Sequence, residues 1–230
     1  MPPTLWTEAH KNALCERGFT VVGPLLTAAE CSEMIAFYDQ DHFRKRVVMQ
    51  RHAYGRGEYQ YFRYPLPDRV AELRTLWYEP LAEVANLWHE QLRIDTRFPN
   101  THAEFLATCR ASGQDKATPL LLRYGPDDFN CLHQDLYGEN VFPLQMAFLL
   151  NQPGESFEGG EFVLVEQRPR RQSRAEVVAL TQGQAVIFAV NHFPGKGTRG
   201  YHRVKMRHGV SRLTRGARHC LGIIFHDART

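Results

Sequence analysis

The sequence has few cysteines, none in a Cys-x-x-Cys pair, and no long apolar run. Its cysteines are odd in number, at positions 15, 31, 109, 131 and 220. A disulfide framework or a cysteine-based zinc site is therefore not expected, and a reducing compartment fits best. No stretch approaches the ~18 apolar residues of a membrane span, and the first twelve residues lack the apolar core of a signal peptide. We expect a cytoplasmic protein with no membrane partner.

Strong charge of either sign is also missing. The net charge of +3 is too small to indicate a class of partner, although a local basic patch could still matter. With 230 residues, 43% of them hydrophobic and 23% charged, the chain is typical of a soluble globular protein with one sizeable core.

Helical patterns dominate the first half. Thr27 and Glu30 form a capping box before an apolar helical face, and Pro80 should bend or break a longer helix. Expected helices cover residues 5–17, 28–38, 68–92 and 102–112. From Pro119 onward, seven or eight short strands at near-regular spacing indicate a sandwich or jelly roll. Within that region, residues 191–200 are expected to be a long polar excursion.

The segment Cys131–Gly138, CLHQDLYG, contains a candidate metal site. In extended chain, His133 and Asp135 point to the same side. With one more histidine they would form a two-His, one-carboxylate face, the ligand set of non-haem iron oxygenases. The simpler alternative is a buried His–Asp pair that stabilises a turn. Candidates for the third ligand are His192, His202, His208, His219 and His226.

A basic residue follows the candidate histidines. His208 ends a strand, Gly216 marks a turn, and Arg218 enters the next strand. A guanidinium in that place could bind a dicarboxylate through two parallel hydrogen bonds.

Two further segments are rich in basic residues, and the first of them is also rich in aromatic residues. Residues 43–64 interleave six Arg and Lys with six aromatics, and residues 167–174 hold four arginines. Such segments can bind phosphates and stack bases. The simpler interpretation is that residues 43–64 form a strand pair with inward aromatics and solvated arginines. Residues 167–174 would then be a solvated loop. The candidate substrate residues here are Arg56, Tyr59, Tyr61 and Arg171.

Five motifs occur in one order: RYG, HQD, FEGGEF, GQAVIF and HGVSRLTRGARHCLGIIF. This set resembles the double-stranded β-helix core of Fe(II)/2-oxoglutarate-dependent dioxygenases. It is closest to the prolyl-hydroxylase-like branch, in which a basic residue follows the last histidine by ten positions. More narrowly, YGRGEYQYF, FRYPLP, CLHQDLYGENVFPLQ, EQRPRRQSRAEV and RHGVSRLTRGARHCLGIIFHDA resemble a bacterial oxygenase family proposed to act on damaged DNA bases.

The resemblance implies an α+β fold with a double-stranded β-helix (jelly-roll) core. Residues 1–117 would be a helical and strand extension, packed on a core of residues 118–230 in one integrated domain. The cofactors would be Fe(II), 2-oxoglutarate and O2. The implied site residues are His133, Asp135 and His208 on the metal, Arg218 on the 5-carboxylate of 2-oxoglutarate, and Tyr124 as a further hydrogen-bond partner of that co-substrate.

No other catalytic residue is implied. His226 and Asp227 are interpreted as structural, and His202 and His219 as surface groups or neighbours of the site.

Three functions stay open at this stage. The first is a dioxygenase that hydroxylates or oxidatively demethylates an alkylated nucleic-acid base. The second is a hydroxylase of a protein side chain or small molecule, which the spacing of His208 and Arg218 favours. The third is a non-enzymatic jelly-roll binding module, which the complete set of ligands with Arg218 opposes. The oligomeric state is left open.

Overall fold

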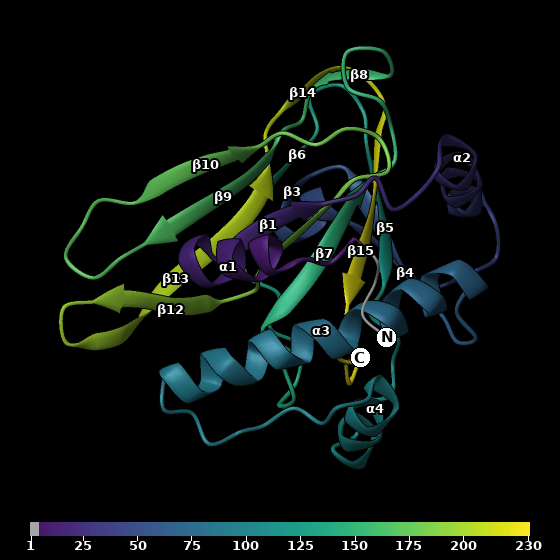
Figure 1. The fold of residues 1–230 in the computed structure, drawn as a ribbon. Coiled ribbons are helices and arrows are strands. Elements are labelled where there is room, and N and C mark those ends of the chain that lie inside the picture. Colours follow the sequence, from purple (N-terminus) through teal and green to yellow (C-terminus); the bar gives the residue numbers. More distant parts are fainter. Residues whose placement is uncertain (1–4) are drawn as a thin grey trace.

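Two antiparallel sheets form the centre of the molecule in the computed structural model, which describes residues 5–230 (Figure 1). The larger has the order β1 (Phe19–Val22), β11 (Ala185–Ala189), β7 (Leu144–Leu149), β15 (Arg218–Ile224), β5 (Leu120–Tyr124), β4 (Glu58–Phe62), β2 (Phe43–Val48). The smaller has the order β10 (Arg174–Val178), β9 (Phe162–Gln167), β13 (Gly200–Val210), β6 (Phe129–His133), β3 (Gly55–Arg56). β8 (Phe157–Gly159) pairs with β14 (Leu213–Gly216). The expected α+β class with a jelly-roll core is confirmed.

Four α-helices lie outside the sheets, close to the predicted positions. They are α1 (Glu8–Arg17), α2 (Ala28–Ala36), α3 (Asp68–Gln91) and α4 (His102–Ala111). Thr27 caps α2 as predicted, and its Oγ1 accepts a hydrogen bond from the Glu30 backbone N–H. Short 3-10 turns cover Phe37–Asp39 and Met49–His52. Helix α3 continues through Pro80, so this proline does not break the helix.

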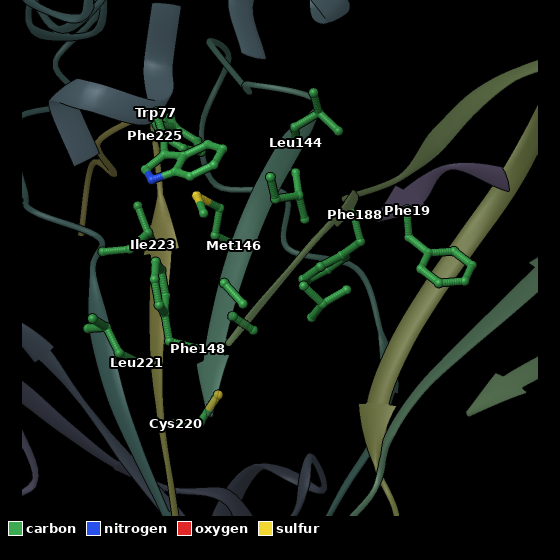
Figure 2. Close-up of a cluster of buried hydrophobic side chains, with 14 of the residues drawn as sticks. Phe19, Trp77, Leu144, Met146, Phe148, Phe188, Cys220, Leu221, Ile223 and Phe225 are labelled. Atoms are coloured by element: carbon green, nitrogen blue, oxygen red, sulfur yellow. The ribbon is translucent and has the colours of Figure 1, made fainter. Parts of the chain in front are cut away.

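The core lies between α3 and the larger sheet. Figure 2 shows Trp77 of α3 beside Phe225, above the side chains of β7 and β15. All six residues of β7 are buried. Strands buried on both faces appear in a sequence as nearly continuous apolar runs, which explains LQMAFL and CLGII.

Strands from the first 117 residues belong to both sheets. β1 pairs with β11, β4 pairs with β5, and β3 pairs with β6. The division into residues 1–117 and 118–230 stays a prediction, and the pairing shows how closely the two segments are interleaved.

The polar excursion expected at residues 191–200 is wrong. They include β12 (His192–Gly197), which pairs along its length with the first half of β13. Val204, Met206 and His208 are buried, whereas Arg203, Lys205 and Arg207 are exposed. One face of the hairpin is solvated, so its polar and glycine-rich composition concealed the strand.

Among residues 5–230 no helix is long and apolar enough to cross a membrane. All five cysteines are free thiols, as expected.

Candidate active site

The smaller sheet brings three candidate ligands together. His133 ends β6, and its Cα partner on β13 is His208. Asp135 follows two residues later, with Oδ1 3.5 Å from His133 Nε2 and Oδ2 3.3 Å from His208 Nε2. Ligand atoms of the three residues all lie within 4.8 Å of one another. This is a spacing at which one metal ion could contact all three.

Neighbouring groups orient two of these side chains. His133 donates from Nδ1 to the Cys131 carbonyl at 2.7 Å, and its Nε2 faces Asp135 Oδ1. Tyr137 donates its hydroxyl to Asp135 Oδ1 at 2.8 Å, and Gln145 donates Nε2 to Oδ2 at 2.9 Å. Both carboxylate oxygens are therefore held in place.

The charges suit a cation. Burial by itself would raise the pKa of Asp135, but the hydrogen bond from His208 and the nearby imidazoles hold it well below the usual range. Burial, followed by the proximity of His133, lowers the pKa of His208. An ionised carboxylate beside a neutral imidazole is the protonation state that metal binding requires.

A cavity of about 370 Å³ opens over the cluster. Its polar lining includes the three candidate ligands, together with Tyr124 and Arg218. Phe162 and Phe188 line it as well, and both are buried. A mostly apolar cavity with a few convergent polar groups is the usual form of a small-molecule site.

Arg218 is the buried cation of this cavity. It begins β15 opposite Tyr124 of β5, and its guanidinium lies 5.6 Å from the centre of the Tyr124 ring. The residue is 1% exposed, yet its Nε and Nη1 have no hydrogen-bond partner within residues 5–230. A buried, unpaired guanidinium is costly unless an anion binds it. The donors present therefore fit a carboxylate ligand.

The turn before β9 fixes the stem of Arg218. Gly159 and Gly160 both have positive φ, 70° and 64°, a conformation that glycine adopts without strain in a tight turn. A Cβ on Gly160 would lie 2.7 Å from Leu213 Cδ1 and 3.1 Å from Arg218 Cδ. Glycine at this position lets the backbone pack directly on the arginine.

The four candidate substrate residues are not brought together. Tyr59 lines the cavity. Tyr61 is buried, and its hydroxyl donates to Tyr137, so it belongs to the hydrogen-bond chain behind Asp135. Arg56 is exposed on β3, 3.9 Å from Asp128, and Arg171 is exposed in the loop between β9 and β10. Neither arginine lines the cavity.

Residues 43–64 otherwise follow the simpler interpretation. Phe62 is buried, whereas Arg63 is exposed and pairs with Asp41. β2 and β4 form the expected strand pair, but Tyr54 and Tyr64 are exposed and do not face inward.

Three residues of the site were missed. Tyr54, 52% exposed, lines the cavity and stacks on His52 with ring centroids 5.3 Å apart. Tyr137 lies two residues after Asp135 in the HQDLY motif, and this spacing could have indicated that it belongs to the site. Gln145 lies in an apolar run that reads as core, and no sequence signal marks it.

The remaining histidines lie apart from the cluster. His219 contacts Asn151 through Nδ1, and Asp227 forms a buried ion pair with Arg74. His226 Nδ1 accepts a hydrogen bond from the Phe142 backbone N–H at 3.2 Å, and the structural interpretation of the 226–227 pair stays a prediction.

Comparison with known proteins gives the family. A sequence model of the Oxygenase-NA family, described as an oxygenase that catalyses oxidative methylation of damaged DNA, matches residues 57–228. The chain belongs to this family. It is therefore an oxidoreductase, as predicted.

Two curated relatives support the assignment. Both are uncharacterised proteins of Mycobacterium tuberculosis strains, 40% identical to this oxygenase over 190 residues, which are 80% of this chain and 82% of theirs.

Solved structures agree on the fold. A Pseudomonas putida prolyl-4-hydroxylase has a TM-score of 0.54 at 15% identity, over 96% of this chain and 98% of that one. A 2OG-Fe(II) oxygenase family member from Burkholderia pseudomallei has 0.55 at 14% identity, over 99% and 94%. The family match confirms the predicted oxygenase class, and the fold and the metal-competent cluster agree with it.

Proposed function

We propose that this oxygenase oxidises an alkylated base of a nucleic acid, with His133, Asp135 and His208 on the iron and Arg218 on 2-oxoglutarate. One observation carries the proposal. A cluster able to hold a metal and a buried, unpaired guanidinium line the same cavity, in a chain whose family description names damaged DNA.

Each protein group has a separate task. Bound iron and 2-oxoglutarate supply the activation of O2 and the oxidation of a C–H bond. Arg218 pairs with the distal carboxylate of the co-substrate, and Tyr124 donates a hydrogen bond to it. Phe162 and Phe188 keep water from this part of the cavity.

The outcome depends on which carbon is oxidised. An oxidised N-methyl group leaves as formaldehyde, whereas an oxidised ring or side-chain carbon keeps its hydroxyl. The family description, which names damaged DNA, supports a base substrate. Tyr59 and Tyr54 line the cavity, and aromatic faces of this kind stack bases.

Anaerobic titration of the Fe(II)-loaded protein with 2-oxoglutarate tests the site first. We expect the weak visible charge-transfer band of the chelate, and we expect His208→Ala to abolish it. His202→Ala is the matched control and should keep the band. Loss of iron from His202→Ala but not from His208→Ala would overturn the ligand assignment.

Substrates are then compared by turnover. Methylated single-stranded DNA should stimulate succinate formation and release formaldehyde, and a proline-rich peptide should not. Stimulation by the peptide alone would favour the hydroxylase alternative. The reducing cytosol stays the predicted compartment, because all five cysteines are free.

A further inference from the structure

Basic side chains are concentrated on two neighbouring hairpins. Residues 162–210, which form β9–β10, β11 and β12–β13, contain nine Lys and Arg but only two acidic residues, Glu166 and Glu176. This segment therefore carries a net charge of +7 from these groups, in a chain whose total is +3. Such asymmetry indicates a local positive field that the overall charge hides.

Most of these cations are unpaired. Arg168 and Arg174 contact Glu166 at 3.2 and 3.3 Å. The other seven are exposed, and their side chains form no ion pair or hydrogen bond within residues 5–230. We call them the hairpin surface: Arg170, Arg171, Lys196, Arg199, Arg203, Lys205 and Arg207. Seven free cations without internal partners are available for an external anion.

The strand β13 arranges three of them in a row. Strand side chains alternate, so Arg203, Lys205 and Arg207 share one face, about 6.7 Å apart along the strand. The buried residues between them, Val204 and Met206, point into the fold. A regular row of cations on an extended strand matches a linear polyanion better than a small ligand.

The two hairpins reach out in the same direction (Figure 1). Gln167, the last residue of β9, is the Cα partner of Lys205. The 168–173 loop, with Arg170 and Arg171, therefore begins beside the part of β13 that carries the row. Tyr201, on the same face of β13, is 45% exposed and adds an aromatic ring.

The row lies on the face of β13 that is opposite to the active-site cavity. Arg207 precedes His208, whose side chain faces the cavity from the other side of β13. On the adjacent strand, Leu132 is 44% exposed and lines the cavity, as does Tyr54. A nucleic-acid strand held on the hairpin surface would therefore have to turn around the sheet to bring a base to these residues.

We propose that the hairpin surface binds the sugar–phosphate backbone of a single-stranded nucleic acid. This inference rests on the proposed function and adds to it the surface that holds the substrate. A single strand is favoured because a base must leave any duplex stack before it can enter a buried site. Unpaired cations beside an exposed aromatic are the usual composition of such a surface.

Fluorescence anisotropy with a labelled oligothymidylate tests the proposal. This probe has no alkylated base, so it measures backbone binding apart from base recognition. The variant Arg170→Gln/Arg171→Gln/Arg203→Gln/Lys205→Gln should bind at least about tenfold more weakly. The slope of log binding constant against log salt concentration should also be shallower by about 3. Four cations are removed, and each single-strand phosphate contact contributes about 0.7 to that slope.

A control variant separates this effect from general loss of charge. Lys11→Gln/Arg110→Gln removes two cations from α1 and α4 and should retain full affinity and slope. Equal weakening in the control would overturn the proposal, as would an unchanged slope in the hairpin variant. Displacement of the probe by polyglutamate as effectively as by unlabelled oligothymidylate would also overturn it.

The 2-oxoglutarate titration distinguishes the two proposals. The hairpin variant should keep the chelate band, because none of its four residues lines the cavity. If the band is kept and wild-type protein does not bind the oligonucleotide, only the hairpin surface is wrong. If wild-type protein gives no band, the proposed function fails whatever the binding result.

Discussion

Arg218 is a buried cation whose surroundings lack an anion. Its stem packs on Gly160 and its head lies near Tyr124, but Nε and Nη1 have no partner within residues 5–230. The protein has placed a charged group where burial is costly, and such placement is common at binding sites. The contacts that surround it fix its position and leave Nε and Nη1 free for a ligand.

Replacing Arg218 tests that role. Arg218→Ala should raise the 2-oxoglutarate concentration for half-saturation by roughly 10- to 100-fold, since a hydrogen-bonded charge pair is worth about 1.5–3 kcal/mol. Iron binding should be unchanged. Arg212→Ala, an exposed arginine that pairs with Asp127, is the control and should have no effect. If wild type and Arg218→Ala reach half-saturation at the same 2-oxoglutarate concentration, Arg218 does not bind the co-substrate.

His102 predicts a pH dependence of stability. Burial, followed by the charge of Arg74, lowers its pKa to about 3, and its Nε2 is 2.9 Å from the Phe225 carbonyl. The unfolded chain takes up a proton near the ordinary pKa of 6.5, whereas the folded protein does not. Stability is therefore lost as pH falls from about 6.5 toward 3, by up to about 1.4 kcal/mol per pH unit for this group.

Denaturant unfolding from pH 7 to pH 4 measures the effect. The free energy of unfolding should fall less steeply with pH in His102→Gln than in wild type over that window. The two slopes should differ by up to about 1.4 kcal/mol per pH unit, the value for one proton. Parallel curves for the two proteins would contradict the assignment.

At the scale of elements, capping fixes where the early helices start. In α2, Thr27 Oγ1 accepts from the Glu30 N–H, and Glu30 Oε2 accepts from the Thr27 N–H at 2.8 Å. Arg69 of α3 adds a contact to Glu30 at 3.0 Å. The box therefore connects local sequence to the packing of α2 beside α3.

Thr27→Ala should lower the free energy of unfolding by about 0.5–2 kcal/mol, since it removes one of the acceptors that satisfy the first-turn N–H groups. Thermal or urea unfolding measures it. Thr27→Ser should lose much less, because the hydroxyl is kept. Equal losses in the two variants would show that the methyl group, and not the cap, matters.

Across the whole molecule, a buried ion pair joins the first half of the chain to its last residues. Arg74 of α3 contacts Asp227 at 2.8 Å, and both side chains are fully buried. Tyr64 donates to the same carboxylate, and the carbonyls of Ile224 and His226 accept from Arg74. This network holds the end of β15 against α3, on the larger sheet that lines the active site.

Removing one partner should be much costlier than removing both. Asp227→Ala leaves a buried, uncompensated guanidinium and should cost about 3–5 kcal/mol of unfolding free energy. The double variant Arg74→Met/Asp227→Leu should recover most of it. Breaking the exposed Arg229–Glu139 pair with Arg229→Ala should cost no more than about 1 kcal/mol. A loss for Asp227→Ala as small as that one would contradict the role of the pair.

Patterns among near neighbours in the sequence were enough to predict the elements and the chemical class. The capping box of Thr27 and Glu30 located the start of α2, because helix termini are set by bonds between near neighbours. The HQD motif and the ten-residue interval between His208 and Arg218 indicated the oxygenase class, because those groups occupy fixed places on paired strands.

Only the tertiary structure decided which residues share the cavity. Gln145 reaches Asp135 from an apolar strand, Tyr61 lies behind the ligands and not on a surface, and Arg56 and Arg171 lie away from the cavity. The hairpin of β12 and β13 was hidden because one solvated face made it appear polar. Contacts between distant strands depend on register and facing, and residue types along the chain do not specify those.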